Sequence, residues 1–133
     1  MSQENVKALR AVYEEWANGN FRAGVELYDE YVLYVPGTEL PDVRPYYVGK
    51  AGIAEYMRAQ LQAWASLTIA ADEFIEATNS LVVAAHWRAV GHGSGTPTES
   101  RYFHVWTFRG RVVVRLELFG DRAEALEAVG LSE

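Results

Sequence analysis

Two adjacent segments near the carboxyl end hold the side chains that could carry chemistry. Residues 100–108 read SRYFHVWTF, an aromatic run with His104 at its centre, and residues 112–119 read VVVRLELF, an aliphatic run that carries Arg115 and Glu117. Because side chains alternate between the two faces of a strand, Arg115 and Glu117 share a face. They form either a solvent-exposed ion pair or the polar floor of a ligand cavity. The alternation alone favours the exposed pair.

Inside a cavity, these groups would support proton transfer. Burial raises the pKa of a carboxyl group and a nearby arginine lowers it, so the surroundings can tune a glutamate as an acid or a base. A histidine titrates near neutrality and can serve in either role. An arginine or tyrosine donor could stabilise the oxygen of an enolate. The chemistry expected of the set is therefore acid/base chemistry on a carbonyl compound.

Helical spacing appears in the first half of the chain. A first helix begins after Ser2, which can cap it, and ends at Asn18-Gly19. We expect a short second helix from Asn20 to about Tyr28 and a third from Lys50 to Trp64. The first helix has an apolar stripe at three- and four-residue spacing, formed by Val6, Leu9, Tyr13, Trp16 and Ala17.

Strand patterns dominate the second half. A brief strand over 31–35 precedes a loop with three of the four prolines. Two-residue alternation then predicts strands over 67–77, 81–90, 101–108 and 112–119, and Asp121 with Glu124 predicts a capped closing helix that ends near Gly130. Helices followed by antiparallel strands indicate an α+β fold in which the helices cover one face of the sheet. The open end of such a layer is a natural small-molecule cavity.

Composition restricts the classes of function. The 133-residue chain is half apolar and 13% aromatic, has no cysteine and carries a net charge of −6. One globular domain is expected, and neither nucleic acid nor an anionic membrane is an expected partner. The first residues lack the apolar run of a signal peptide, so we expect a cytoplasmic protein. Three histidines without ligand spacing, and no phosphate-loop or nucleophile-elbow motif, predict neither metal nor cofactor.

Two stretches carry a resemblance to a known superfamily. Residues 13–28 (YEEWANGNFRAGVELY) and 108–131 (FRGRVVVRLELFGDRAEALEAVGL) resemble the nuclear transport factor 2-like superfamily, in its SnoaL-like branch of polyketide cyclases and relatives of ketosteroid isomerase. The resemblance implies one such domain over residues 1–133. Its fold would be a curved antiparallel sheet wrapped on three N-terminal helices, a cystatin-like α+β barrel with a cone-shaped cavity and a short C-terminal helix.

The resemblance also implies site residues. SnoaL-like cyclases place a carboxylate late on the last strand, where this chain has Glu117, with Arg115 beside it. The second aspartate of the isomerases falls at His104, whereas their catalytic base falls at Pro36, which leaves Asp42 as a weaker alternative base. In this superfamily a dimer partner often covers the outer sheet face, which favours the cavity for Arg115 and Glu117. The expected cavity wall is aromatic and comprises Tyr13, Trp16, Tyr34, Trp87, Tyr102 and Trp106.

Two functions stay open at this point. The first is a cofactor-independent isomerase or cyclase that acts on a hydrophobic ketone. The second is a non-catalytic domain of the same fold that binds a small ligand or dimerises. Both imply a small hydrophobic molecule as partner, and an aliphatic outer row with Phe103 and Val105 predicts a homodimer.

Overall fold

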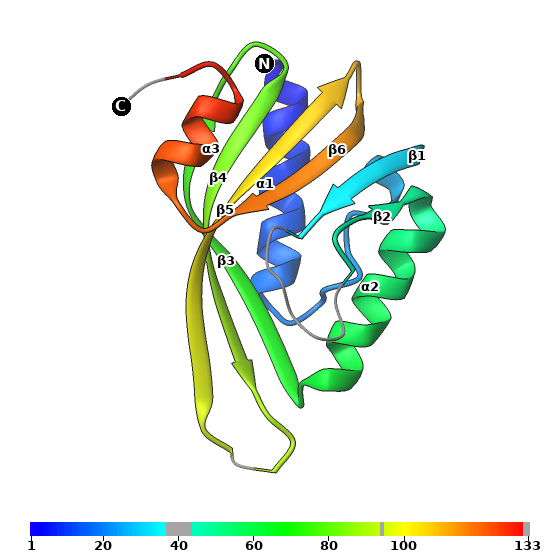
Figure 1. Ribbon diagram of the computed structural model, residues 1–133, viewed down its shortest axis with the longest axis vertical. Coiled ribbons are helices and arrows are strands. Elements are labelled where there is room, and N and C mark those ends of the chain that lie inside the picture. The colour runs from blue at the N-terminus through cyan, green and yellow to red at the C-terminus, as the bar shows by residue number, and fades with distance from the viewer. Residues whose placement is uncertain (37–43, 94, 132–133) are drawn as a thin grey trace.

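The structure is a computed structural model that describes residues 1–36, 44–93 and 95–131 (Figure 1). Its described elements alternate in type only at the beginning and then form a run of strands, as an α+β fold requires. In chain order they are α1 (Gln3–Ala17), the 3-10 helix η1 (Val25–Leu27), β1 (Tyr28–Val35), β2 (Tyr47–Val48), α2 (Gly49–Ala63), β3 (Ser66–Glu76), β4 (Ser80–Val90), β5 (Pro97–Arg109), β6 (Val112–Phe119) and α3 (Arg122–Ala128).

Helix α1 forms as its capping and spacing predict. The Ser2 hydroxyl accepts a hydrogen bond from the backbone N–H of Asn5 at 3.2 Å, and Gly19 follows the end of the helix with a φ of +93°. The buried stripe includes Val12, whereas Ala17 is exposed. The helix is therefore held by one apolar face against the sheet, as most helices of globular proteins are.

The predicted second helix is wrong. Most of the segment from Asn20 to Tyr28 is a series of turns, and only η1 is helical. Gly24 interrupts it with a φ of +93°, a conformation that glycine adopts readily. A Cβ atom at Gly24 would lie 2.9 Å from Cγ2 of Val12, so this turn also brings the chain close against α1. In the described part of the chain, two α-helices and the short 3-10 helix η1 precede the long strands.

The sheet has the order β2-β1-β6-β5-β4-β3 and is curved and open. Consecutive strands β3 to β6 pair antiparallel, as predicted, but β1 pairs with β6 in parallel. The short strand β2 lies within the proline-rich segment, where the sequence predicted only a loop. The four long strands begin and end within about a residue of the predicted bounds except β5, which begins four residues earlier, at Pro97. The α+β class is confirmed, and the sheet does not close into a barrel.

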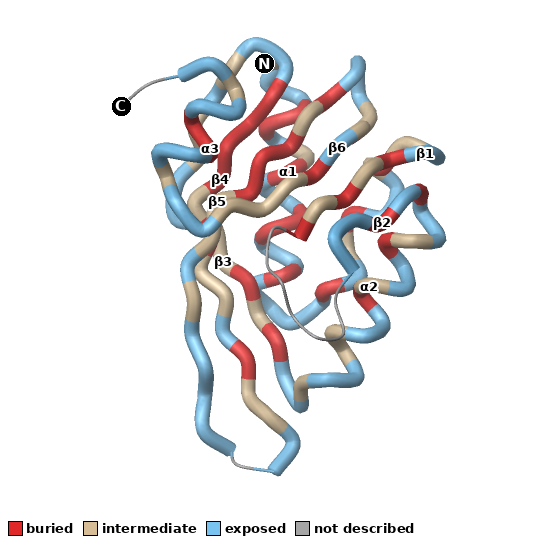
Figure 2. The backbone as a smooth tube through the Cα atoms, viewed as in Figure 1, coloured by how far each residue is buried: buried red, intermediate tan, exposed pale blue. Residues whose placement is uncertain are grey.

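The two faces of the sheet are buried by different helices (Figure 2). The main core lies between the sheet and helices α1 and α2, and it includes Leu9, Ile53 and Val83. Helix α3 packs on the opposite face, where Ala125 and Leu126 cover Val82 and Val105. Because Val82 and Val83 are neighbours on β4, the strand shows the alternation of a sheet covered on both sides.

No helix in the described part of the chain combines the length and the apolar character needed to span a membrane.

Candidate functional site

A cavity of about 330 Å³ lies on the side of the sheet that α1 and α2 cover. Aromatic side chains form most of its wall: Trp16, Phe21, Tyr28, Tyr34, Tyr56, Trp64, Trp87 and Tyr102. The other lining residues are Pro36, Ile53, Met57, Gln60, Ala63, Ile69, His104, Leu116 and Leu118. Among these lining residues none is an aspartate, glutamate, lysine or arginine. The cavity is thus a neutral, largely apolar space with a few polar atoms at its wall.

His104 is the one lining residue with an imidazole side chain, a group that ordinarily titrates near neutrality. The residue is only 4% exposed. Its Nδ1 lies 2.5 Å from the hydroxyl oxygen of Tyr13, and Trp106 donates its indole N–H to that same oxygen at 2.8 Å. Desolvation by burial lowers the pKa of His104 from 6.5 to about 3, so the ring is neutral at physiological pH. His104 therefore offers the cavity a neutral imidazole.

Tyr13 and Trp106 support His104 from behind the cavity wall. Both are buried core residues, at 3% and 1% exposure, and neither lines the cavity. Burial raises the pKa of the Tyr13 hydroxyl well above 10, so it keeps its proton. The sequence placed both side chains at the wall; the structure places them one layer deeper. Trp16, Tyr34, Trp87 and Tyr102 do line the cavity.

Arg115 and Glu117 lie on the other face of the sheet, and the expectation that they form the cavity floor is wrong. Leu116 and Leu118 line the cavity instead. The Arg115 guanidinium contacts the Glu117 carboxylate at 2.9 Å, with the two side chains 47% and 23% exposed. They form a partly solvated ion pair, which was the first of the two alternatives that their spacing left open.

Strand register is the physical reason. Paired residues of adjacent strands point to the same face, and β5 pairs His104 with Leu118 and Trp106 with Leu116. Glu117 pairs with Val105, which packs under α3 on the outer face. A one-residue shift in register would exchange the two faces. Asp42, the weaker alternative base, lies outside the described residues.

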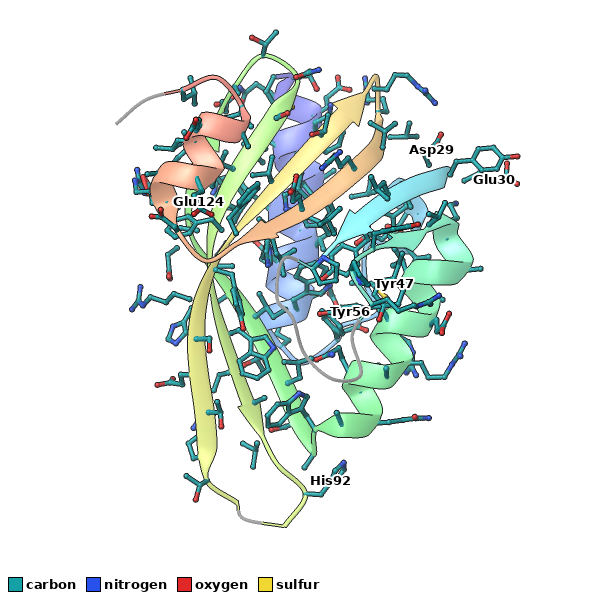
Figure 3. All side chains as sticks on the ribbon, viewed as in Figure 1. Asp29, Glu30, Tyr47, Tyr56, His92 and Glu124 are labelled. Atoms are coloured by element: carbon teal, nitrogen blue, oxygen red, sulfur yellow. The ribbon has the colours of Figure 1, made fainter. Side chains whose placement is uncertain are left out.

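Helix α2 contributes lining residues that the sequence reading missed. Tyr56, Gln60 and Ala63 follow one another at four- and three-residue spacing, so they share a helical face that looks into the cavity. Tyr56 packs edge-on against Tyr34 with ring centroids 4.6 Å apart and against Tyr47 at 5.3 Å. Figure 3 shows Tyr47 and Tyr56 together between α2 and the sheet. The helical spacing was the signal that could have found this face.

The opposite end of the cavity is bounded by two tryptophans. Trp64, at the end of α2, meets Trp87 of β4 edge to face, with ring centroids 5.1 Å apart. Close by, a ring nitrogen of His92 lies 2.9 Å from the backbone oxygen of Gln62, which ties the β4–β5 hairpin to the end of α2. The cavity therefore has an imidazole on its inner wall and a pair of indole rings near the C-terminal end of α2.

A SnoaL-like domain model matches residues 9–116, which is most of the chain. The chain belongs to the SnoaL-like domain family. The comparison with curated proteins finds no match. The resemblance seen in the sequence is thus confirmed at the level of the family.

Solved structures share the fold of this SnoaL-like domain along nearly its whole length. TerC, co-crystallized with polyporic acid, is 22% identical with a TM-score of 0.76 and coverage of 94% of this chain and 96% of its own. A nuclear transport factor 2-like protein from Burkholderia pseudomallei is 23% identical, with a TM-score of 0.75 and coverage of 98% and 99%. A protein with a ketosteroid isomerase-like fold from Catenulispora acidiphila, in complex with trimethylamine, is 17% identical, with a TM-score of 0.70 and coverage of 98% and 95%.

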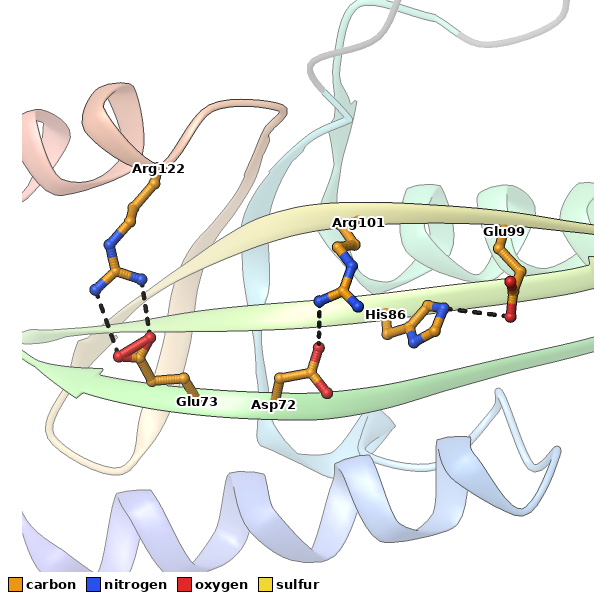
Figure 4. A network of polar contacts seen from close by, with 6 residues as sticks. All are labelled: Asp72, Glu73, His86, Glu99, Arg101 and Arg122. Carbon is orange, nitrogen blue, oxygen red and sulfur yellow. Dashed lines mark hydrogen bonds and ion pairs between the residues drawn. The ribbon is translucent and has the colours of Figure 1, made fainter.

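The outer face of the SnoaL-like sheet carries a second group of titratable side chains (Figure 4). Arg122 contacts Glu73 at 2.8 Å, Arg101 contacts Asp72 at 3.5 Å, and His86 lies 3.4 Å from Glu99. Each acidic group therefore has a basic neighbour. These acidic and basic side chains pair with one another, and the sheet separates them from the cavity.

Proposed function

We propose that this SnoaL-like domain binds a neutral, mostly apolar small molecule of two or three rings in its cavity. The observation that carries the proposal is the neutral, aromatic wall, in which burial keeps the one imidazole, that of His104, in its neutral form. A charged ligand would lose its hydration there without gaining an opposite charge, which is costly. A flat apolar ligand would instead exchange water for contact with aromatic faces.

Cavity size supports a ligand of this class. Dry apolar cavities of about 150 Å³ take up benzene, and small-molecule pockets commonly reach roughly 300–1,000 Å³. At about 330 Å³, the cavity holds more than one ring. Two proteins of the same fold were crystallised with an acid and with an amine, polyporic acid and trimethylamine respectively. Such different ligands imply that the lining side chains, and not the fold, select what is bound.

Equilibrium dialysis with the planar tricycles fluorene and fluorenone tests the proposal. We expect saturable binding of one ligand per chain. The matched variants Gln60→Trp and Gln62→Trp lie on the same helix, but only Gln60 lines the cavity. Gln60→Trp should fill the cavity and weaken binding at least tenfold, whereas Gln62→Trp should leave it within about twofold. Binding that Gln60→Trp does not weaken, or no binding of either tricycle, would contradict the proposal.

A cofactor-independent isomerase or cyclase is the second candidate function, and the neutral imidazole of His104 favours it. Neutral histidine can polarise a ketone carbonyl in an active site. Glu117, the base expected from the resemblance, is on the outer face, and the described lining residues include no carboxylate. Asp42 stays a prediction as the base. Bound ketones with exchangeable α-hydrogens, incubated in D₂O and followed by NMR, should gain deuterium faster than without protein; an unchanged exchange rate would leave binding alone.

A homodimer is proposed as the assembly. Tyr31, Tyr46 and Val48 are 76%, 59% and 55% exposed on or beside β1 and β2, which leaves large apolar side chains in solvent. Phe103 and Val105, which the sequence assigned to the dimer surface, pack against α3 instead. Light scattering should give a mass near twice 14.9 kDa, and Tyr31→Glu should lower it. A mass of one chain at micromolar concentration would contradict the dimer.

A further inference from the structure

The hydrogen bonds behind the cavity wall run in one direction. The indole nitrogen of Trp106 can only donate, so the Tyr13 oxygen accepts at that contact. Tyr13 has a single hydroxyl proton, and its other hydrogen-bond partner among the described residues is Nδ1 of His104 at 2.5 Å. If Nδ1 donated instead, the hydroxyl proton would have no acceptor in a buried site, which is costly. The proton therefore points from Tyr13 to His104.

This direction fixes the tautomer of His104. A neutral imidazole has one protonated nitrogen, so an Nδ1 that accepts a hydrogen bond leaves the proton on Nε2. Tyr13 is the hydrogen-bond partner of this ring in the described part of the chain, and His104 is part of the cavity wall. Its Nε2–H is thus available to a molecule in the cavity. The relay from Trp106 through Tyr13 therefore ends in a donor group on a residue of the cavity wall.

We infer that His104 presents a fixed Nε2–H donor, so that the cavity selects ligands with a hydrogen-bond acceptor, such as a ketone or quinone carbonyl, over ligands of the same shape that lack one. Tyr13 acts as a positioning residue, because it holds the tautomer without touching the ligand. The inference rests on the proposed function, since it specifies the ligand class of the same cavity.

The other polar side chains of the cavity wall do not replace His104 as the donor that Tyr13 fixes. The rings of Tyr34 and Tyr56 belong to a separate cluster with Tyr47, and Gln60 is on α2. Two further tyrosines, Tyr28 and Tyr102, also line the cavity. A hydroxyl can rotate to donate or accept, and an amide presents both groups, so neither discriminates between donors and acceptors. The indole N–H groups of Trp64 and Trp87 can only donate, whatever residue stands at position 13, whereas the Nε2–H of His104 is a donor that Tyr13 fixes. The selection is therefore expected to depend on Tyr13.

Three planar tricycles of similar shape test the selection: fluorenone accepts a hydrogen bond, carbazole donates one, and fluorene does neither. Dissociation constants are measured by equilibrium dialysis for the natural sequence and for Tyr13→Phe, and each preference is expressed relative to fluorene. We expect Tyr13→Phe to reduce the relative preference for fluorenone roughly three- to tenfold, the usual contribution of one hydrogen bond. The preference for carbazole should rise, because the freed ring can place its proton on Nδ1 and accept at Nε2.

A second measurement needs no variant. Nitrogen-15 NMR of histidine-labelled protein near pH 7 should show a neutral ring for His104 with a protonated Nε2 and an unprotonated Nδ1. A proton on Nδ1, or preferences that are the same in Tyr13→Phe and in the natural sequence, would overturn the inference and leave the proposed function intact. If none of the three tricycles binds, the proposed function fails, whatever tautomer the spectrum shows.

Discussion

The inner and outer faces of strands β3 to β6 handle polar groups in opposite ways. On the inner face, Trp106, Tyr13 and His104 form a buried series of hydrogen bonds without any formal charge. On the outer face, charged side chains form pairs that stay in contact with solvent, such as Arg101 with Asp72. Strand β5 supplies His104 and Trp106 to the inner set and Arg101 to the outer one, because neighbouring residues of a strand point to opposite sides; Tyr13 comes from α1.

The most conspicuous charges in the sequence are therefore not the groups best placed for ligand recognition. Ion pairs in water contribute little, because solvent screens them and long side chains lose entropy when they are held together. A hydrogen bond in a low-dielectric interior is stronger, and a polar group left without its partner there is costly. We therefore expect substitutions on the inner face to have the larger effects.

The largest effect is expected for Trp106→Ala. Trp106 is 1% exposed, and its loss would leave a cavity and remove the donor to Tyr13. We expect the free energy of unfolding to fall by about 3–5 kcal/mol, as for other buried tryptophans. Urea unfolding measures it, with Arg101→Ala on the outer face of the same strand as control, where less than about 1 kcal/mol is expected. Similar losses for both variants would show that the two faces do not differ in this respect.

The second effect is a loss of stability in mild acid. The pKa of His104 is lowered from 6.5 to about 3 in the folded chain, whereas the unfolded chain keeps the ordinary value. Between these values the unfolded chain binds a proton that the folded chain does not, so the unfolding free energy falls as the pH falls. The slope is about 1.4 kcal/mol per pH unit. The stabilisation is complete above pH 6.5, and it should fall by about 2 kcal/mol between pH 6.5 and 5.

Urea unfolding at several pH values from 7 to 5 measures this slope. His104→Asn is the control, because an amide oxygen can accept from Tyr13 but does not titrate; the variant should be less stable at pH 7 and lose less on acidification. The measurements stop at pH 5 so that Glu73 does not contribute to the slope. Its contact with Arg122 lowers the pKa of this carboxyl group, and the stability that the contact supplies is lost only when the pH falls below the ordinary pKa of 4.5. An equal slope in both proteins would show that His104 is not the group responsible.

The third effect concerns the pair on β6. A double-mutant cycle with Arg115→Ala and Glu117→Ala should give a coupling energy of less than about 1 kcal/mol, because Arg115 is 47% exposed. Raising the salt concentration to about 1 M should reduce it further, since the screening length falls to about 3 Å. A coupling well above that value, insensitive to salt, would indicate that the pair is shielded from solvent, for example by a dimer partner.

The smallest effect is expected for ligand binding by Glu117→Gln. The carboxylate lies on the outer face, so the dissociation constants of fluorene and fluorenone should stay within about twofold of those of the natural sequence. Equilibrium dialysis measures them beside those of Tyr13→Phe. A tenfold change of a dissociation constant with Glu117→Gln would indicate that this carboxylate faces the cavity, and it would contradict the register of β6.

Local patterns in the sequence predicted most elements of the fold. The Ser2 cap, the spacing of Leu9 and Tyr13, and the alternation along β4 and β6 are local signals, and each element formed nearly where its signal lies. The helix predicted after Asn20 does not form as expected, because Gly24 favours a turn that packs on Val12. Strand β2 was not predicted, because two residues are too few to show a periodicity. They form a strand by pairing with β1.

The amino-acid pattern was enough to predict that a histidine, an arginine and a glutamate lie on the last two long strands, and that aromatic residues flank the histidine. Which face of the sheet each of them occupies depends on how the strands pair in the folded chain. In β6 a bulge pairs Thr107 with Arg115 but Phe108 with Val113, which leaves Val114 as an extra residue and puts Val113 and Leu116 on the same inner face. Because one added residue inverts the alternation, no count of residues along the strand could have placed Glu117 in the absence of its neighbours.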